Sequence, residues 1–321
     1  MKGRTDLSII FMGTPDFAVG ILDTIFQNKF SIKAVVTSPD KPAGRGLQLN
    51  ESAVKKYAQD HHLKILQPEK LKDESFLNEL QLLNADLFVV VAFRMLPEQV
   101  WSMPRLGTIN VHASLLPQYR GAAPINWAII NGEKTTGVTT FFIEKEIDTG
   151  KIIDQSTIEI GKDENVGSLY QRLMDLGAQT MLTTLDKINI GAIEPISQDE
   201  LINTELKAAS KIYKEDCKIS WDTNVTNAHN FVRGLSPYPA AWTILQNKSS
   251  RETKQFKIFS GEITNIPIVN RNDLKDDNLG ILIPCNDFYY AVQELQQEGK
   301  RRMHFKEFLA GNKIEHWELF I

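Results

Sequence analysis

Short apolar runs alternate with amphipathic segments through the first part of the chain. Residues 7–12 form an apolar run that predicts a buried strand, and apolar side chains at helical spacing from Ala18 to Phe26 predict a helix behind it. Thr14 is expected to cap this helix, with Pro15 in its first position. The same pattern predicts strands at residues 32–37, 86–92 and 108–112 and helices at residues 52–60 and 74–83. Such alternation is typical of an open, doubly wound, Rossmann-like α/β domain with a parallel sheet.

The pattern of the second half is different. Strands at residues 136–143 and 151–158 and a long helix at 166–188 are expected to complete the first domain. Later, a helix near residues 224–235 precedes short strands at 241–245, 256–260, 280–284 and 288–295. Several short strands with few helices indicate a small β-barrel. We therefore predict a catalytic domain at residues 1–190, a linker at 191–210 and a barrel domain at 211–321.

Length and composition agree with two globular domains in one chain. The chain has 321 residues, and single cores usually stop growing before that size. Its longest apolar run, Leu87 to Phe93, is far below the roughly 20 residues that span a bilayer. No signal-peptide core follows Met1, and the two cysteines, Cys217 and Cys285, lack metal-ligand spacing. We expect a cytoplasmic protein with reduced, buried thiols.

The charge balance limits how nucleic acid could bind. The chain carries 36 Lys and Arg against 40 Asp and Glu, a net charge of −4. A nucleic-acid-binding protein often has a basic balance, and this one does not. Any contact with a polyanion would therefore depend on local positive patches.

Two polar side chains lie close to the end of a predicted strand. Asn110 and His112 are two residues apart, so both point to the same face. Open α/β sheets bind ligands beyond the carboxyl ends of their strands. There an amide can donate to a developing oxyanion, and an imidazole can move a proton near neutral pH. The alternative is a hydrogen-bonded Asn-His pair that only stabilises the following loop.

A polar turn between two later strands contains Asp148, Thr149 and Gly150. Asp148 could orient His112 and stabilise its cation, or it could be an ordinary turn residue. The G-x-G-x-x-G pattern is absent after the first strand, which disfavours a nicotinamide dehydrogenase. No cluster with the spacing of metal ligands is found, so no metal is expected.

The stretch from Asn110 to Pro124, NVHASLLPQYRGAAP, together with Asp148-Thr149-Gly150, resembles the folate-dependent formyltransferases. This resemblance implies catalytic roles for Asn110, His112 and Asp148. It also implies that the loop made by Ser114, Leu115, Leu116 and Pro117 lines the site for 10-formyltetrahydrofolate. Ala92 to Pro97 departs from the family form without an evident chemical consequence.

Other segments are similar to those formyltransferases that act on methionyl-tRNA, along nearly the whole chain. Ser38 to Gly46 looks like the loop that meets the acceptor end of the tRNA, although Leu47-Gln48-Leu49 follows where many relatives have basic residues. The C-terminal segments resembling the family's OB-type second domain are Lys211 to Trp221, Arg233 to Pro239 and Glu298 to Met303. The positively charged candidates for tRNA contact are Lys41, Arg45, Lys300, Arg301 and Lys306.

The resemblance implies transfer of a formyl group from 10-formyltetrahydrofolate to the amino group of initiator methionyl-tRNA, by a monomeric enzyme of translation initiation. Two alternatives stay open on the sequence. One is a formyltransferase acting on an amino-sugar nucleotide or another small amine, for which the same three residues would serve. The other is a non-catalytic folate- or RNA-binding protein on the same scaffold, which the intact set of three residues disfavours.

Overall fold

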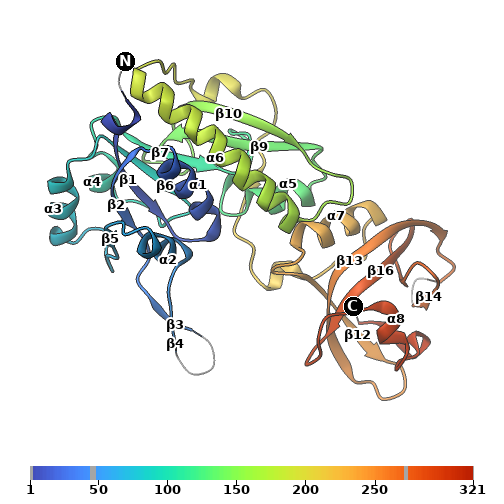
Figure 1. Cartoon of the computed structure of the whole chain (residues 1–321). Helices are drawn as coiled ribbons and strands as arrows, with labels where there is room; N and C mark the ends of the chain where they lie inside the picture. The colour runs from blue at the N-terminus through green and yellow to red at the C-terminus, as the bar shows by residue number, and fades with distance from the viewer. Residues whose placement is uncertain (1–2, 44–47, 271–273, 321) are drawn as a thin grey trace. The chain divides into compact units, whose positions relative to one another are not determined.

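The computed structural model describes residues 3–43, 48–270 and 274–320. The chain divides into two compact units (Figure 1). The first comprises Met1–Pro124, Thr136–Ile158 and Tyr170–Ala208, and the second Ile125–Thr135, Glu159–Leu169 and Ala209–Ile321. Two segments from the middle of the chain thus pack with the C-terminal residues. Residues 191–208, expected as a linker, belong to the first unit.

The first unit is built on one sheet in which β1 is flanked by parallel neighbours on both sides. The strand order is β10-β9-β7-β6-β1-β2-β5. The strands are β1 (Ser8–Gly13), β2 (Ser31–Val36), β5 (Ile65–Leu66), β6 (Leu87–Val91), β7 (Thr108–His112), β9 (Thr135–Phe142) and β10 (Ile152–Glu159). The pairs β1/β2, β1/β6, β2/β5 and β6/β7 are parallel, and β7/β9 is antiparallel. The predicted Rossmann-like order is confirmed, with an antiparallel extension at the edge that carries β9.

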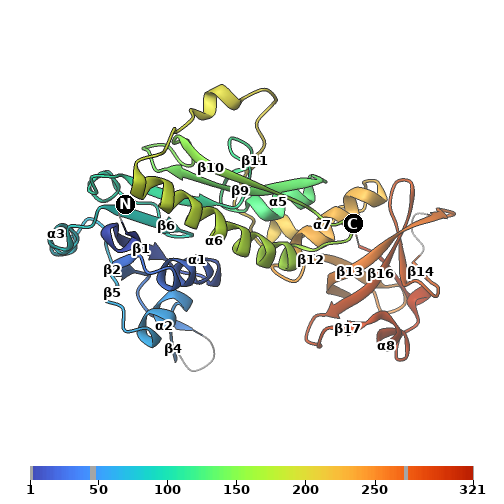
Figure 2. The same ribbon diagram turned by 45° about the horizontal axis from the view of Figure 1, so that its top comes forward.

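Helices cover both faces of this sheet. They are α1 (Asp16–Gln27), α2 (Ala53–Asp60), α3 (Glu74–Leu83), α4 (Glu98–Trp101) and α6 (Val166–Ile190), whereas α5 (Pro124–Ile130) belongs mostly to the second unit. On one face α1 and α6 lie side by side (Figure 2), and Phe17 meets Tyr170 edge to face with ring centroids 5.4 Å apart. On the other face, Phe76 and Leu80 of α3 and Val100 of α4 pack against apolar side chains of β1 and β6. The domain is therefore doubly wound.

The start of α1 differs from the sequence prediction. The helix begins at Asp16 with Pro15 as its N-cap, and the Pro15 side chain cannot accept a hydrogen bond. The free N–H of Phe17 instead donates to the hydroxyl of Tyr170 at 2.9 Å. A side chain from α6, more than 150 residues later, thus satisfies the group that Thr14 was expected to satisfy.

Besides the large sheet there are two short two-stranded pairs, of which β3/β4 is antiparallel. The strands β3 (Lys41–Ala43) and β4 (Gln48–Asn50) form one pair, and β8 (Arg120–Gly121) joins β11 (Ala208–Ala209) in the other. Short 3₁₀ turns are found at Arg4–Asp6, Gln198–Leu201, Glu215–Cys217 and Ile314–His316.

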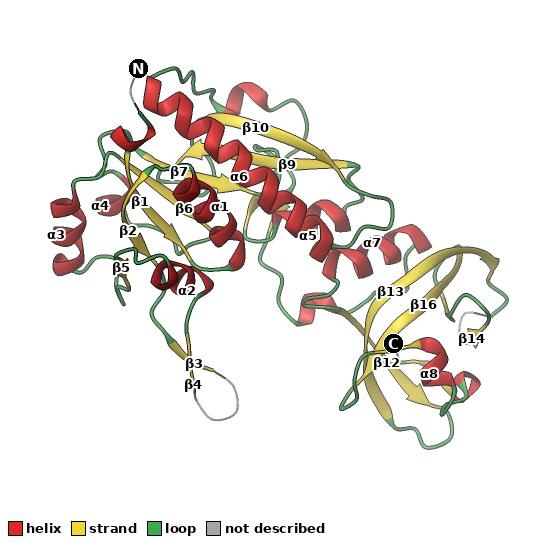
Figure 3. Cartoon of the chain, viewed as in Figure 1, coloured by secondary structure: helices red, strands yellow, loops and turns green. Residues whose placement is uncertain are grey.

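The second unit is a curled antiparallel half-barrel, which confirms the predicted OB-type domain (Figure 3). Its strand order is β14-β15-β16-β13-β12-β18, with β17 paired to β16. Its elements are α7 (Val225–Leu235), β12 (Ala241–Asn247), β13 (Thr253–Pro267), β14 (Lys275–Asp276), β15 (Ile281–Pro284), β16 (Phe288–Gln297), β17 (Met303–His304), α8 (Phe305–Leu309) and β18 (Trp317–Leu319). Register shifts within β13 let this long strand curl, because each bulge increases the local bend.

The core of the second unit is apolar and contains both cysteines. Val225, Val232 and Leu235 of α7 pack against strand residues such as Phe256. Cys217 and Cys285 are buried free thiols, as expected. Burial raises the pKa of Cys285 to about 12, so this thiol stays protonated and behaves as a small hydrophobic side chain.

Candidate active site

The carboxyl ends of three neighbouring strands meet at one edge of the first sheet. Register places Gly13 beside Val91 and Val90 beside Asn110, so β1, β6 and β7 end together. A side chain at Gly13 would collide with Ala18, at 2.6 Å, so only glycine lets α1 pack this close to the end of β1. This edge is where an open α/β sheet offers a ligand site.

Asn110 and His112 project from β7 onto the same face at this edge. Asn110 is partly exposed, whereas His112 is 7% exposed. Within the described residues, no side chain hydrogen-bonds the Asn110 amide. The structure therefore brings the two predicted residues together but does not pair them, and the Asn110 amide can still donate to a ligand.

One ring nitrogen of His112 is hydrogen-bonded to the backbone, and the other faces a carboxylate. Its Nε2 lies 2.7 Å from the carbonyl oxygen of Tyr119. Because a carbonyl oxygen only accepts, Nε2 must carry a proton. Nδ1 lies 3.7 Å from Oδ2 of Asp148. Proton exchange on this ring is therefore directed to Nδ1, where Asp148 can stabilise the cation.

Asp148 occupies a turn whose backbone and side chain are both held. Its φ is +56°, in the left-handed region that Asp tolerates better than most residues. The backbone N–H of Gly121 donates to its Oδ2 at 2.9 Å. The same oxygen faces His112, so the carboxylate joins the loop after β7 to the turn after β9.

Gln198 and Arg120 fix this turn, and the sequence analysis did not identify either one. The Gln198 amide donates to the carbonyl oxygens of Asp148 at 2.8 Å and Gly150 at 2.9 Å. Its Oε1 accepts from Arg120 Nε at 3.0 Å and Nη2 at 2.7 Å. Gln198 is 2% exposed. It lies in the segment predicted as a linker, and its partners are 48, 50 and 78 residues away, so no local pattern could reveal it.

The loop expected to line the folate site is tightly held to the sheet. Thr139 donates to the Ser114 carbonyl at 2.7 Å and accepts from the Leu116 N–H at 3.1 Å. Gln155 donates to the Leu116 carbonyl at 2.7 Å. The side chains of Ser114, Leu116 and Pro117 are buried and Leu115 is half-buried. The folate role of this loop stays a prediction, and these hydrogen bonds fasten the loop to β9 and β10.

The predicted tRNA contacts fall in both units. Lys41 is exposed on β3, and Arg45 lies outside the described residues. Lys300, Arg301 and Lys306 are exposed around the β16–β17 turn and α8. Arg301 forms an ion pair with Glu307, so its charge is already compensated locally.

Two further features bear on the class of site. Among the described residues, no three His, Cys, Asp or Glu side chains are arranged to hold a metal ion. The described helices are too short or too polar to cross a membrane.

Comparison with known proteins agrees with the geometry. The formyl transferase family matches residues 7–185, and the formyl transferase C-terminal domain matches residues 211–313. The chain belongs to the formyl transferase family. A methionyl-tRNA formyltransferase from Bacteroides fragilis is 49% identical over 311 residues, 96% of each chain. Another from Flavobacterium johnsoniae is 51% identical over 306 residues, 95% of this chain and 96% of that one.

A solved structure shares the fold at lower similarity. The sugar 3N-formyltransferase WlaRD, crystallised with dTDP and 5-N-formyl-THF, superposes with a TM-score of 0.65. It is 21% identical, and the match covers 92% of this chain and 99% of that one. At this identity the likeness establishes the fold only.

Proposed function

We propose that this protein is a methionyl-tRNA formyltransferase, which transfers the formyl group of 10-formyltetrahydrofolate to the amino group of initiator methionyl-tRNA. The observation that carries the proposal is the His112–Asp148 pair at the sheet edge, in a chain about half identical over its whole length to enzymes of that name. Formyl transfer to charged initiator tRNA is the assay that tests it.

The reaction is an acyl transfer that needs no ATP, since the folate co-substrate supplies an activated formyl group. The unprotonated methionyl amine attacks the formyl carbon, a new C–N bond forms and the bond to the folate nitrogen breaks. The amine loses a proton and the departing nitrogen gains one. The protein must therefore stabilise negative charge on the formyl oxygen and move one proton.

Each residue of the site has a role in this scheme. Asn110 donates its free amide N–H to the oxyanion. His112 carries the proton at Nδ1, while its Nε2 stays bonded to Tyr119. Asp148 stabilises the imidazolium and holds the ring in place, as carboxylates do beside catalytic imidazoles. The loop from Ser114 to Pro117 positions the folate beside them.

A substitution of Gln198 tests whether catalysis depends on the hydrogen bonds that fix the Asp148 turn. Gln198→Glu keeps an acceptor for Arg120 but cannot donate to the carbonyls of Asp148 and Gly150. We expect kcat to fall by up to about 100-fold, because displacement of a catalytic group by about 1 Å has an effect of that size. Steady-state kinetics and the melting temperature should be measured together.

The matched control for this change is Gln179→Glu, the same substitution on the exposed surface of α6. It should have wild-type kinetics. Should Gln198→Glu also retain wild-type kcat, the Asp148 turn does not depend on Gln198, and the positioning role is wrong.

Binding of tRNA by an acidic chain requires local positive charge. Lys41 and Arg45 in the first unit and Lys300, Arg301 and Lys306 in the second are the proposed contacts. A sugar nucleotide needs no extended array of this kind, and the relatives near 50% identity are methionyl-tRNA enzymes. Both observations favour tRNA over the amino-sugar alternative. A charged tRNA as substrate also places the reaction in the cytoplasm, and we propose that the enzyme acts there as a monomer.

Lys300 and Arg301 should contribute unequally to tRNA binding. Among the described residues, Lys300 has no ion-pair partner, whereas Arg301 must leave Glu307 before it can bind a phosphate. Replacing each with Ala should weaken binding, and the slope of log Kd against log salt should fall by about one unit for Lys300. The effect of Arg301→Ala should be smaller.

Filter binding or fluorescence titration across salt concentrations measures both slopes. Lys72→Ala, which removes an exposed charge from the first unit, is the control for net charge alone. Equal slopes for Lys300→Ala, Lys72→Ala and wild type would show that Lys300 makes no phosphate contact.

A further inference from the structure

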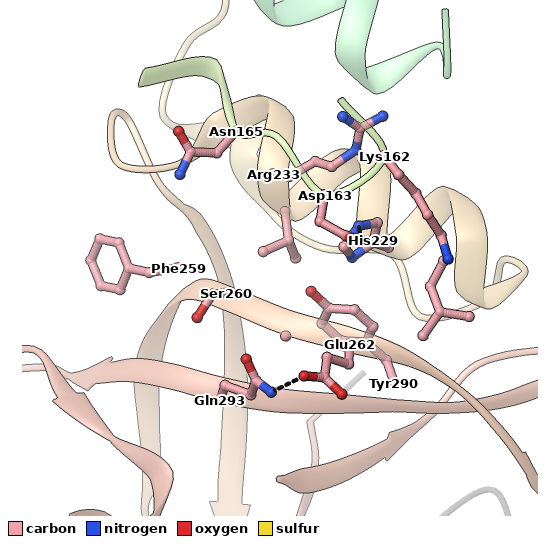
Figure 4. A pocket seen from close by; sticks show the side chains of 13 residues that line it. Lys162, Asp163, Asn165, His229, Arg233, Phe259, Ser260, Glu262, Tyr290 and Gln293 are labelled. Atoms are coloured by element: carbon pink, nitrogen blue, oxygen red, sulfur yellow. Dashed lines mark hydrogen bonds and ion pairs between the residues drawn. The ribbon is translucent and has the colours of Figure 1, made fainter. Parts of the chain in front are cut away.

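A separate cavity lies within the second unit, and neither Asn110 nor His112 is among its lining residues (Figure 4). Its volume is about 420 Å³, within the range of roughly 300–1,000 Å³ that is usual for small-ligand sites. Side chains of α7, β13, β16 and the segment before α6 line it. Those that the argument uses are Asp163, His229, Val232, Glu262, Tyr290 and Gln293.

The hydroxyl of Tyr290 is the first unusual feature of this cavity. Tyr290 is 0% exposed, and its oxygen has no hydrogen-bond partner within the described part of the chain. Burial raises the pKa of this phenol, so it is a neutral O–H group. Leaving a buried hydroxyl unpaired costs free energy, and native proteins rarely do so. A molecule in the cavity would satisfy it.

His229 is the second unusual feature of the cavity. It is 5% exposed, and its ring centroid lies 6.0 Å from that of Tyr290. Its Nε2 lies 3.3 Å from Oδ1 of Asp163, yet neither ring nitrogen makes a well-directed hydrogen bond to a described residue. Burial, and then the nearby charge of Arg233, lower the pKa of His229. The neutral ring presents one donor and one acceptor.

The charges around the cavity restrict what it can hold. Arg233 is already engaged, since its guanidinium donates to the Glu164 carbonyl at 2.9 Å and to Asn230 Oδ1 at 2.9 Å. Asp163, which is 74% exposed, and Glu262 place two carboxylates on the wall, which balance the positive charges of Lys162 and Arg233. A phosphate would therefore meet no net positive charge. A flat, uncharged group with its own donors and acceptors suits the wall better, because apolar side chains such as Val232 adjoin the polar ones.

We propose that this cavity binds one unpaired nucleobase of the bound tRNA, with hydrogen bonds to the Tyr290 hydroxyl and the His229 ring. The proposal rests on the proposed function, since it takes tRNA as the substrate. Proteins that read single-stranded RNA commonly hold a splayed base between aromatic and polar side chains in this way.

Tyr290→Phe tests the proposal with a change of one oxygen atom. This hydroxyl has no hydrogen-bond partner among the described residues, so the melting temperature should be unchanged or higher. Affinity for uncharged initiator tRNA should fall by about two- to tenfold, the range for one lost hydrogen bond. The salt slope should not change, because a nucleobase contact releases no counterions.

Tyr289→Phe is the matched control. Tyr289 is the next residue of β16, is also buried, and lies outside the cavity lining. Its hydroxyl donates to the Asn270 carbonyl at 3.4 Å. This variant should bind tRNA like the wild type. His229→Phe, which removes the other proposed contact, provides a second variant should Tyr290→Phe fold poorly, and it should also weaken binding.

Several outcomes would overturn the proposal. Unchanged affinity in both Tyr290→Phe and His229→Phe would mean that the cavity holds no base of the tRNA. A loss of salt slope would indicate a phosphate, and equal losses in Tyr289→Phe and Tyr290→Phe would indicate general damage to the domain. Stabilisation by free nucleosides without any change in tRNA affinity would indicate a separate small-molecule site. Formyl transfer by the wild type, measured on the same preparation, keeps the proposed function distinguishable from this cavity.

Discussion

His112→Ala is expected to lower kcat by about 100- to 10,000-fold, the usual effect of removing a general acid-base group. The substitution removes the only group beside Asp148 that we propose to carry the transferred proton at Nδ1. It also leaves the Tyr119 carbonyl without its partner, at a cost of roughly 1–3 kcal/mol in stability. Rapid-quench formyl transfer and thermal melting separate these two effects.

His112→Gln is the control that separates chemistry from packing. Its amide N–H can replace Nε2 as donor to Tyr119 but cannot take up a proton. Stability should recover relative to His112→Ala, and activity should not. Asn110→Ala belongs to the same test, with an expected loss of about 100- to 1000-fold for one oxyanion donor. A variant at either position that retains half of the wild-type turnover would refute its catalytic role.

Asp148→Asn is expected to remove most activity, by about 100-fold or more, while the turn survives. Asn tolerates a φ of +56° as well as Asp does, and its side-chain oxygen can still accept from Gly121. The substitution removes the negative charge of Asp148, whose Oδ2 lies 3.7 Å from Nδ1 of His112. Without this charge the imidazolium is less stable. The pH-rate profile and the melting temperature should be recorded for the same preparations.

The role of Asp148 is decided by comparing the change in kcat with the change in melting temperature. We expect a large fall in kcat with little change in melting temperature. If activity falls only in proportion to stability, Asp148 is a turn residue and the ring of His112 needs no carboxylate.

Local patterns in the sequence predicted most of the elements. The helix α3 and the strand β7 lie at the predicted residues, because their apolar periodicity and flanking polar residues are local properties. That Asn110 and His112 point to the same face of the sheet also follows from strand geometry alone. The catalytic meaning of that pair needed the family resemblance, since spacing does not distinguish a site from a stabilised loop.

Features that depend on distant contacts were missed. The cap of α1 comes from Tyr170, and the Asp148 turn depends on Gln198, each through a contact that no window of sequence contains. The same is true of the two chain segments that join the second unit. The ion pair between Arg301 and Glu307 joins residues only six positions apart. It still depends on the path of the chain from β17 into α8, which the local sequence pattern does not give.

The central claim is tested most directly by formyl transfer from 10-formyltetrahydrofolate to two acceptors under identical conditions. One acceptor is initiator tRNA charged with methionine, and the other is a dTDP-linked amino sugar. The product is formylmethionyl-tRNA in the first case and a formylated sugar in the second. We predict rapid turnover with the charged tRNA, lost in Asn110→Ala, and no turnover above background with the amino sugar. Formylation of the amino sugar with none of the tRNA would contradict the account.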